Sequence, residues 1–347
     1  MKQLLFFAVS AFYFSTLNAQ VTQLIANQNM QFRTVLNQTK SIYESGVDST
    51  LWVTDGTTAG TFQLSNTIKA TDSQEGLLNG KYIFSAILPA TGEEYFITDG
   101  TKAGTTLIKD INPGPEGSVP GNTTVTLLNG YVYFPAITAA NGCELWRSDG
   151  TAANTTMVKD INPGAADGIS RDDGSFDFRI LNGYLYFPAT SPASGYELWK
   201  SDGTTANTSL VMDINPGTAA SQPLITESDK MVFKGNLYFV AVTASQGCEL
   251  WRTNGTSTSI VKDIVPGAAS GIDSTKFSIM IIGNNLVFKA TTPEFGNEYW
   301  YSSDGTTANT NILKDITAGA RSSSLPYNSG DTAKTVGNYF LFSVPDS

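Results

Sequence analysis

The sequence predicts an all-β fold, a β-propeller built from four-stranded blades. The first observation is a string of about 50 residues that recurs along the chain, and its Asp-Gly or Asn-Gly turn has glycine at positions 56, 100, 150, 203, 255 and 305. The second is that every copy contains short apolar segments separated by turn residues. The third is a composition rich in Gly, with 32 residues, and in Phe and Tyr, with 33 together. Many short strands joined by tight turns are expected from such a chain.

The first 19 residues have the pattern of a cleaved signal peptide. Lys2 supplies a positive charge, residues 4–14 are apolar apart from Ser10, and Ala19 provides a small residue before Gln20. The apolar run is too short to span a membrane. We therefore expect an exported protein, extracellular or on the outer cell surface, with the periplasm as the alternative. Residues 20–347 are expected to form a single propeller domain.

The repeated string is clearest in the third unit. Residues 144–151 read Glu-Leu-Trp-Arg-Ser-Asp-Gly-Thr, and residues 157–164 read Met-Val-Lys-Asp-Ile-Asn-Pro-Gly. All five tryptophans occupy one repeat position, which we expect to pack between blades: Trp52, Trp146, Trp199, Trp251 and Trp300.

Each unit is expected to contain four strands, called a to d in chain order. In the fourth unit they are predicted at residues 178–181, 184–189, 196–201 and 209–214. Asn182-Gly183 between the first two is a strong hairpin signal, because both residue types accept positive φ. A repeat of this length with four strands is typical of a propeller blade.

The number of blades follows from the two ends of the chain. Six units have all four strands, and residues 336–342 resemble strands a and b of a seventh. Residues 21–25 resemble a strand d. We expect seven blades, closed by joining the N- and C-terminal strands, with six blades as the alternative.

The string Glu-Leu-Trp-x-Ser-Asp-Gly-Thr followed by Val-Lys-Asp-Ile-Asn-Pro-Gly resembles the repeat of exported bacterial proteins, notably from Bacteroidota, called ELWxxDGT-repeat proteins. The resemblance covers nearly all of residues 31–347 and implies export and a propeller fold. The Ser-Asp-Gly-Thr turn also resembles the Asp-box of sialidase-type propellers. That resemblance implies a structural role for the turn.

Composition excludes several classes of function. The chain has no histidine, which removes Ser-His-Asp and Cys-His catalysis and the commonest zinc ligand. Its net charge is −10 and no basic cluster is present, so neither nucleic acid nor membrane insertion is expected. We expect no cofactor and no metal, with calcium as an alternative, and a monomer.

The repeated acidic residues are expected to be structural. The aspartates of the turn are predicted to cap it: Asp55, Asp99, Asp149, Asp202 and Asp304. Glu144 is predicted to form a cross-strand ion pair with Lys159. The strand-d aspartates, such as Asp160, are expected to shape the exit before Asn-Pro-Gly. Cys143 and Cys248 occupy equivalent positions in blades that do not touch, so two free, buried thiols are expected.

Strand order places the a–b and c–d turns on one face and the b–c and d–a connections on the other. We expect the b–c and d–a connections to be longer and variable, and therefore to carry binding residues. The longest, residues 165–176, supplies the candidate ligand-binding residues: Asp167, Arg171, Asp172 and Asp173.

The function expected from the sequence is non-catalytic binding of a glycan or a cell-surface protein, and no catalytic residue is proposed. The alternative is a polysaccharide-active hydrolase or lyase resembling a sialidase. It depends on arginines that converge at the axis, where Arg33 and Arg179 on strand a are the candidates.

Overall fold

The protein is described from a computed structural model. The structure describes residues 29–121, 125–171, 178–224, 231–293, 296–313, 334–336 and 339–341. The described residues form two compact units, one from the part of the chain before residue 140 together with Trp146–Met157, and the other from Ala140–Leu145 and the part after residue 157. The expectation of a single domain over residues 20–347 stays a prediction.

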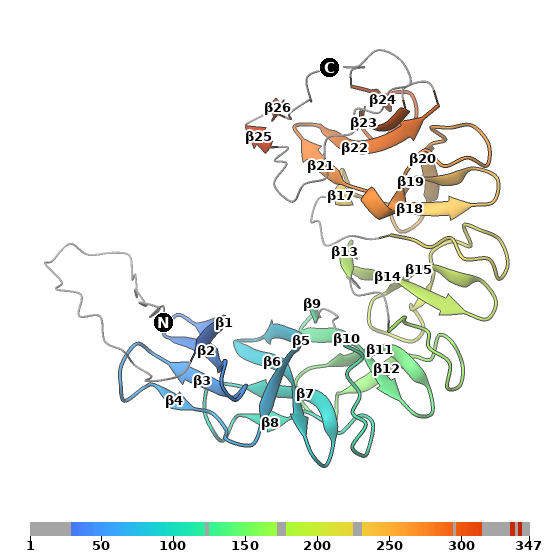
Figure 1. Ribbon diagram of the computed structural model, residues 1–347. Helices are drawn as coiled ribbons and strands as arrows, with labels where there is room; N and C mark the ends of the chain where they lie inside the picture. Colours follow the sequence, from blue (N-terminus) through green and yellow to red (C-terminus); the bar gives the residue numbers. More distant parts are fainter. Residues whose placement is uncertain are drawn as a thin grey trace, which may run out of the picture. The chain divides into compact units, whose positions relative to one another are not determined.

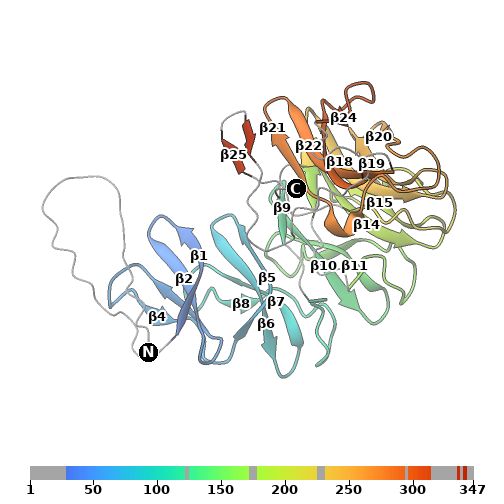
Figure 2. The same cartoon turned by 45° about the horizontal axis from the view of Figure 1, so that its top comes forward.

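Six four-stranded antiparallel sheets form the blades of an all-β, propeller-type fold, as the repeat predicts (Figure 1). In every blade the four strands pair in chain order, so that each strand hydrogen-bonds to the one before it. Figure 2 shows the same blades from another direction, each one a twisted ribbon of neighbouring strands.

The strands of blades 1 to 3 are β1 (Met30–Asn37), β2 (Lys40–Ser45), β3 (Leu51–Thr54), β4 (Phe62–Gln63), β5 (Lys69–Leu78), β6 (Lys81–Leu88), β7 (Gly92–Thr98), β8 (Thr106–Leu107), β9 (Thr126–Leu128), β10 (Tyr131–Thr138), β11 (Gly142–Ser148) and β12 (Thr156–Lys159).

The strands of blades 4 to 6 are β13 (Arg179–Leu181), β14 (Tyr184–Ser191), β15 (Gly195–Ser201), β16 (Ser209–Leu210), β17 (Val232–Phe233), β18 (Asn236–Thr243), β19 (Gly247–Thr253), β20 (Thr258–Lys262), β21 (Ile279–Ile282), β22 (Asn285–Thr292), β23 (Gly296–Ser303) and β24 (Asn311–Ile312). A 3₁₀ turn, η2 (Ser274–Lys276), lies between blades 5 and 6, and a hairpin of β25 (Lys334–Val336) and β26 (Tyr339–Leu341) follows blade 6.

The a–b hairpins form where Asn-Gly predicts them. In blade 4, Leu181 pairs with Tyr184, which leaves Asn182 and Gly183 as the two turn residues. Their φ values of 52° and 78° are both positive, as a two-residue hairpin of this type requires.

The strands that flank this hairpin differ in part from the expected bounds. Strand b continues to Ser191, whereas strand d ends at Leu210 instead of residue 214. Strand d is short because the backbone N–H groups of Ile214 and Asn215 turn away from the ladder and donate to the buried Glu197 carboxylate. The Glu197 side chain therefore takes the backbone N–H of Ile214, which the sequence pattern assigns to the sheet.

The prediction of longer, variable b–c connections is wrong. In blades 2 to 5 only three residues separate strands b and c, as between Thr138 and Gly142. Gly142 has φ of 64°, and a Cβ there would lie 2.5 Å from the Ala166 carbonyl oxygen. A close approach of the d–a loop thus requires glycine and keeps the b–c turn tight.

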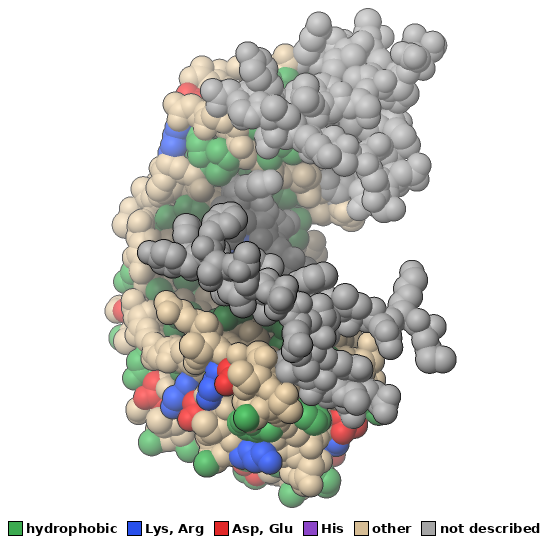
Figure 3. All heavy atoms as spheres, turned by 90° about the vertical axis from the view of Figure 1, so that its left-hand side faces the viewer, with side chains coloured by type: hydrophobic (Ala, Val, Ile, Leu, Met, Phe, Trp, Pro, Cys, Tyr) green, Lys and Arg blue, Asp and Glu red, His purple; other side chains and the backbone are tan. Residues whose placement is uncertain are grey.

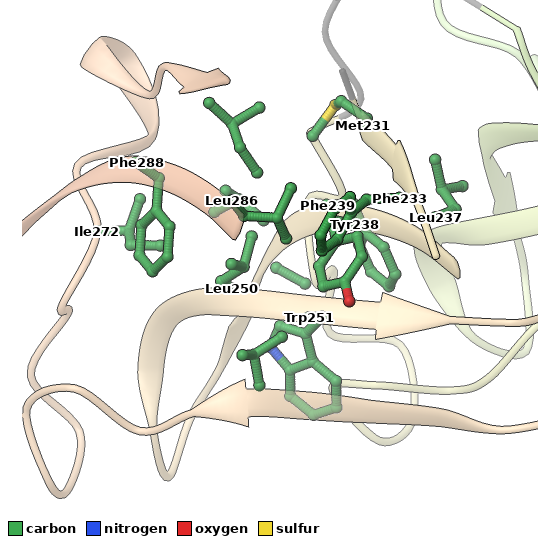
Figure 4. Close-up of a cluster of buried hydrophobic side chains, with 14 of the residues drawn as sticks. Met231, Phe233, Leu237, Tyr238, Phe239, Leu250, Trp251, Ile272, Leu286 and Phe288 are labelled. Carbon is green, nitrogen blue, oxygen red and sulfur yellow. The ribbon is translucent and has the colours of Figure 1, made fainter. Parts of the chain in front are cut away.

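The hydrophobic core consists of clusters of apolar side chains between consecutive blades. In the second unit, Tyr238, Phe239, Leu250 and Trp251 of blade 5 belong to one buried cluster with side chains of blades 4 and 6, and Figure 4 shows part of it. Strands b and c supply most of these side chains and are apolar on both faces, because each inner sheet is covered on both sides. The core therefore positions the blades, and their turns and loops remain at the surface.

Candidate functional site

The predicted loop residues lie on the d–a connection of blade 3. Arg171 donates from Nε to Asp167 Oδ2 at 2.7 Å and from Nη2 to Asp167 Oδ1 at 2.5 Å. Asp167 Oδ1 also accepts from the Cys143 backbone N–H at 2.8 Å. The two side chains are 32% and 40% exposed, so they are accessible to a ligand. Asp172 and Asp173 lie outside the described residues.

Glu144 and Lys159 do not form the predicted ion pair. Glu144 is fully buried, and its carboxylate accepts from the backbone N–H groups of Ile161 and Asn162, both at 3.1 Å. Lys159 instead donates from Nζ to the Thr208 carbonyl oxygen of blade 4 at 2.7 Å. Burial explains the error, because a buried carboxylate needs several donors and the start of the d–a loop brings backbone N–H groups to it.

The same arrangement recurs at the strand-c glutamate of four consecutive blades. Glu94 accepts from Asn112 N–H at 3.2 Å and from Ser118 Oγ at 2.6 Å. Glu249 accepts from Gly271 N–H at 2.7 Å. Together with Glu144 and Glu197, these glutamates have no exposed surface. Each one ties the d–a loop to strand c of its own blade.

Burial dominates the electrostatics of these glutamates. It raises the pKa of Glu94 and of Glu144 to about 7, and that of Glu249 to about 8. The donated hydrogen bonds oppose this rise, whereas a neighbouring strand-d aspartate, such as Asp263 beside Glu249, adds to it. The pKa of Glu197 is also raised by burial, and the hydroxyl of Ser221 opposes the rise.

The turn aspartates cap the c–d turns, as expected. Asp149 Oδ1 accepts from the Thr151 backbone N–H at 2.9 Å and from its hydroxyl at 2.7 Å, and Asp149 Oδ2 accepts from Asn154 Nδ2 at 2.7 Å. Asp55, Asp99, Asp202 and Asp304 make the same two bonds to the threonine two residues on. Bonds from Thr306 and Asn309 lower the pKa of Asp304 to about 2. The carboxylate oxygens thus accept hydrogen bonds from residues of the same turn.

Three of the repeat tryptophans line the seams between consecutive blades: Trp146, Trp199 and Trp251. The expectation that all five share one position is wrong for blade 6, where the extra residue places Tyr301 opposite Phe288, as Trp199 lies opposite Phe187. Trp146, Trp199 and Trp251 are at most 8% exposed, Trp52 is half-buried, and the Trp300 side chain lies outside the described residues. Lys109 lies 5.7 Å from the ring centroid of Trp146 in the next blade and donates to the Thr155 carbonyl oxygen at 2.8 Å. A lysine of one blade thus covers the tryptophan of the next and bonds its c–d turn.

The strand-d aspartates shape the loop exit. Asp213 Oδ2 accepts from Gly217 N–H at 3.0 Å, and Asp160 makes the equivalent contact to Gly164 at 3.5 Å. Asp160 Oδ2 also accepts from Asn141 Nδ2 at 3.0 Å. These contacts close the Asn-Pro-Gly segment and join it to the b–c turn.

Both cysteines are free and buried, as predicted. Burial raises the pKa of the Cys143 thiol to about 12 and that of the Cys248 thiol to about 11. The thiolate, which is the reactive form, is therefore scarce at neutral pH.

The two strand-a arginines have different surroundings. In the first unit, Arg33 donates from Nε to Glu44 Oε2 at 2.8 Å and also lies 3.9 Å from a Glu75 oxygen. In the second unit, Arg179 donates from Nη1 to the Phe178 carbonyl oxygen at 3.0 Å. Two carboxylates therefore already neutralise Arg33.

The described residues contain neither a cluster of metal ligands nor a membrane-spanning helix. No three acidic or cysteine side chains lie together as a set of metal ligands in that part of the chain. Within the same residues, no helix has the length and apolar character of a membrane span.

Sequence comparisons give no relative. No family model matches the chain, and no curated protein matches it. Among solved structures, the computationally designed Ika8 protein is 11% identical with a TM-score of 0.39, over 84% of this chain and 74% of that one.

Two further solved structures are similarly distant. A puromycin hydrolase is 12% identical with a TM-score of 0.38, over 84% of this chain and 48% of that one. A prolyl endopeptidase is 9% identical with a TM-score of 0.40, over 81% of this chain and 41% of that one. The chain thus spans less than half the length of either.

Sequence reasoning missed the loop-anchoring role of the glutamates and the seam lysines. The sequence did carry a signal for the role of the glutamates. The sixth residue after the asparagine of Asn-Pro-Gly, or after the valine that replaces it in blade 5, is small: Ser118, Gly168, Ser221 and Gly271. A Cβ at Gly168 would lie 2.3 Å from Glu144 Oε1, so a small residue is needed beside the carboxylate.

Proposed function

We propose that this protein is an exported, non-catalytic binding or scaffold propeller that recognises a glycan or a cell-surface protein through its loop face. The observation that carries the proposal is the anchoring of successive d–a loops by buried glutamates. Loops held in place lose little conformational entropy when a ligand binds. The side chains of these loops differ from blade to blade, and the partly exposed pair of Asp167 and Arg171 is the candidate for specificity in blade 3.

The finer fold and the location belong to the same proposal. A seventh blade made by strands from both ends of the chain would close the ring, and the repeated ELWxxDGT-like string supports kinship with exported bacterial repeat proteins. The pattern of residues 1–19 supports export. A ring closed in this way suits a binding protein that acts outside the cell.

A polysaccharide-active enzyme is the weaker candidate. The carboxyl groups with raised pKa values, which enzymes use as general acids, have no exposed surface and are enclosed by loop N–H groups. Arg33, which a sialidase-like site would use for a substrate carboxylate, is occupied by Glu44. Both observations favour binding over catalysis.

The proposal is tested by probing a glycan array with labelled residues 20–347, with calcium and with chelator, together with a cross-linking search for protein partners on the cell surface. We expect selective binding that the double variant Asp167→Ala/Arg171→Ala weakens about tenfold, as loss of one charged contact pair of about 1.4 kcal/mol predicts. Lys81→Ala, an exposed charge at an a–b turn, serves as the matched control. Absence of both a glycan and a protein partner would contradict the proposal.

A further inference from the structure

One face of blade 1 is covered less than the equivalent face of blade 2. On β2 and β3, Tyr43 lies directly opposite Trp52, and both side chains are half-buried. The equivalent pair in blade 2 is Phe84 and Phe96, each 1% exposed in a cluster that includes side chains of blade 1. No described blade precedes blade 1, so its face lacks that cover. The side of the molecule that carries blade 1 shows acidic, basic and hydrophobic side chains close together (Figure 3).

Leu64 supplies part of the cover between blades 1 and 2. It follows β4 directly, is 3% exposed and belongs to the same buried cluster as Phe84 and Phe96. Its backbone N–H donates to the Leu51 carbonyl oxygen at 2.8 Å, which holds it beside strand c of blade 1. The residue that follows an outer strand can therefore fill the seam to the next blade.

Strand a begins in the same register in both blades. Met30 of β1 pairs with Ser45, two residues beyond Tyr43. Ala70 of β5 pairs with Ala86, two residues beyond the equivalent phenylalanine. Met30 and Ala70 are therefore equivalent positions, and the residues that precede them can be compared one by one.

The segment 20–28, which lies outside the described residues, repeats the spacing that precedes Ala70. Leu64 lies six residues before Ala70, Leu24 lies six residues before Met30, and each leucine follows a glutamine. The carbonyl oxygen of Asn29, the next residue, accepts from the Gly46 backbone N–H at 2.7 Å. The segment therefore joins blade 1 at a fixed point beside its b–c turn.

We propose that residues 21–24 dock on the face of blade 1 that carries Tyr43 and Trp52, with Leu24 in the place that Leu64 has in the next seam, and that removal of residues 1–19 permits this docking. An aliphatic side chain against two aromatic rings removes apolar surface from water on both sides. Residues 20–29 have no charged side chain, so no ionic group is buried with Leu24. The inference rests on the proposed function only in taking residues 1–19 as a leader that is removed on export.

Distance links leader removal to docking. The first docked residue, Val21, lies two residues after Ala19, where the sequence predicts cleavage. Two extended residues span only about 7 Å. A leader held in a membrane, whose hydrocarbon core is about 30 Å thick, therefore keeps Val21 close to the membrane and away from a folded blade. The seam of blade 1 is completed once the chain is free of its leader.

Hydroxyl-radical footprinting with mass spectrometry measures how fast each tryptophan side chain is oxidised, and therefore how exposed it is. In residues 20–347 we expect Trp52 to react about as slowly as Trp199, which is 8% exposed. Leu24→Asp places a charge on the apolar face, so we expect the Trp52 rate to rise at least about threefold while the Trp199 rate is unchanged. Gln23→Asp is the matched control, because adjacent side chains of an extended segment point to opposite sides, and it leaves the Trp52 rate unchanged.

A folded tag tests the dependence on leader removal. Joined directly to Gln20, the tag takes the place of the leader, and we expect Trp52 to react as fast as in Leu24→Asp. The same tag joined through a flexible Gly-Ser linker of about 15 residues leaves the segment free, so the slow rate of the untagged chain returns. Melting temperatures from circular dichroism exclude unfolding as the cause of a faster rate.

Each outcome decides the proposal. Equal Trp52 rates in the wild type and in Leu24→Asp would overturn the docking, and a slow Trp52 rate in the directly tagged chain would overturn its dependence on leader removal. Protection of Trp52 that disappears on dilution and persists in Leu24→Asp would identify a second copy as the occupant and would also overturn the proposal. Glycan-array binding of the same variants tests the proposed function separately. If neither the wild type nor Leu24→Asp binds a ligand, the proposed function fails, and the Trp52 rates still decide the docking.

Discussion

Blades 4 and 5 share one pattern and differ at three points that show what each repeat residue does. Glu197 of blade 4 accepts from the Ser221 hydroxyl, whereas Glu249 of blade 5 faces Gly271 and accepts its N–H. Burial raises the pKa of both carboxyl groups, and the Ser221 hydroxyl opposes the rise at Glu197. The residue facing the glutamate therefore decides whether a side chain or only the backbone of the d–a loop holds the buried carboxylate.

The other two differences concern the c–d turn and the seam. Blade 4 has Asp202 and a seven-residue connection between strands c and d, whereas blade 5 has Asn254 and a connection shorter by three residues. Lys159 Nζ lies 5.7 Å from the ring centroid of Trp199 in blade 4. The next blade has Met212 at the position of Lys159, and Met212 is 39% exposed. The seam therefore tolerates loss of a lysine where the turn that the lysine bonds is also changed.

The largest expected effect comes from removing a buried glutamate. Glu197→Ala leaves several loop N–H groups without an acceptor and opens a cavity, so we expect the free energy of unfolding to fall by about 3 kcal/mol. Glu249→Ala should cost less, because Glu249 Oε2 accepts no hydrogen bond and fewer donors lose their acceptor. Urea denaturation measures both. An equal loss of stability in the two variants, or a larger loss in Glu249→Ala, would contradict the proposed difference between the two blades.

The pH dependence of stability is the next largest effect. The pKa values of Glu144 and Glu249 are higher in the folded state than in the unfolded state, so the folded state binds more protons. The stabilisation from the protonated glutamates is complete below about pH 4.5, and it is lost as the pH rises through the folded values of about 7 and 8. We therefore expect the melting temperature to fall between pH 5 and pH 9. Glu249→Gln, which cannot ionise, should flatten the upper part of that fall. A melting temperature that rises over this range would contradict the assignment.

The smallest effect is expected at the seam. Lys159→Met introduces the residue that blade 4 has at this position, Met212. The change removes one cation–π contact and one hydrogen bond, so we expect the free energy of unfolding to fall by about 1 kcal/mol. Met212→Lys should give no comparable gain, because the shortened turn of blade 5 alters the bond that a lysine makes there. Thermal unfolding of both variants tests this, and a matching gain at position 212 would show that turn length is irrelevant.

The candidate site was predictable only in part. Asp167 and Arg171 were found because charged residues interrupt a long connection, and they do lie together. The buried role of Glu144 was not predicted, because Lys159, fifteen residues later in the repeat, indicated a cross-strand ion pair instead.

The sequence by itself determined the six blades, their strand order and their turns. These depend on local chemistry, namely Asn-Gly at positive φ in three a–b turns, aspartate caps in five c–d turns and apolar strands, and the periodic spacing makes each signal visible several times. The tertiary structure alone decided which polar groups meet. Donors for Glu144 come from residues 17 and 18 positions away, and the partners of Lys159 come from the next blade. Such pairings depend on how folded segments approach one another, which short-range pattern does not encode.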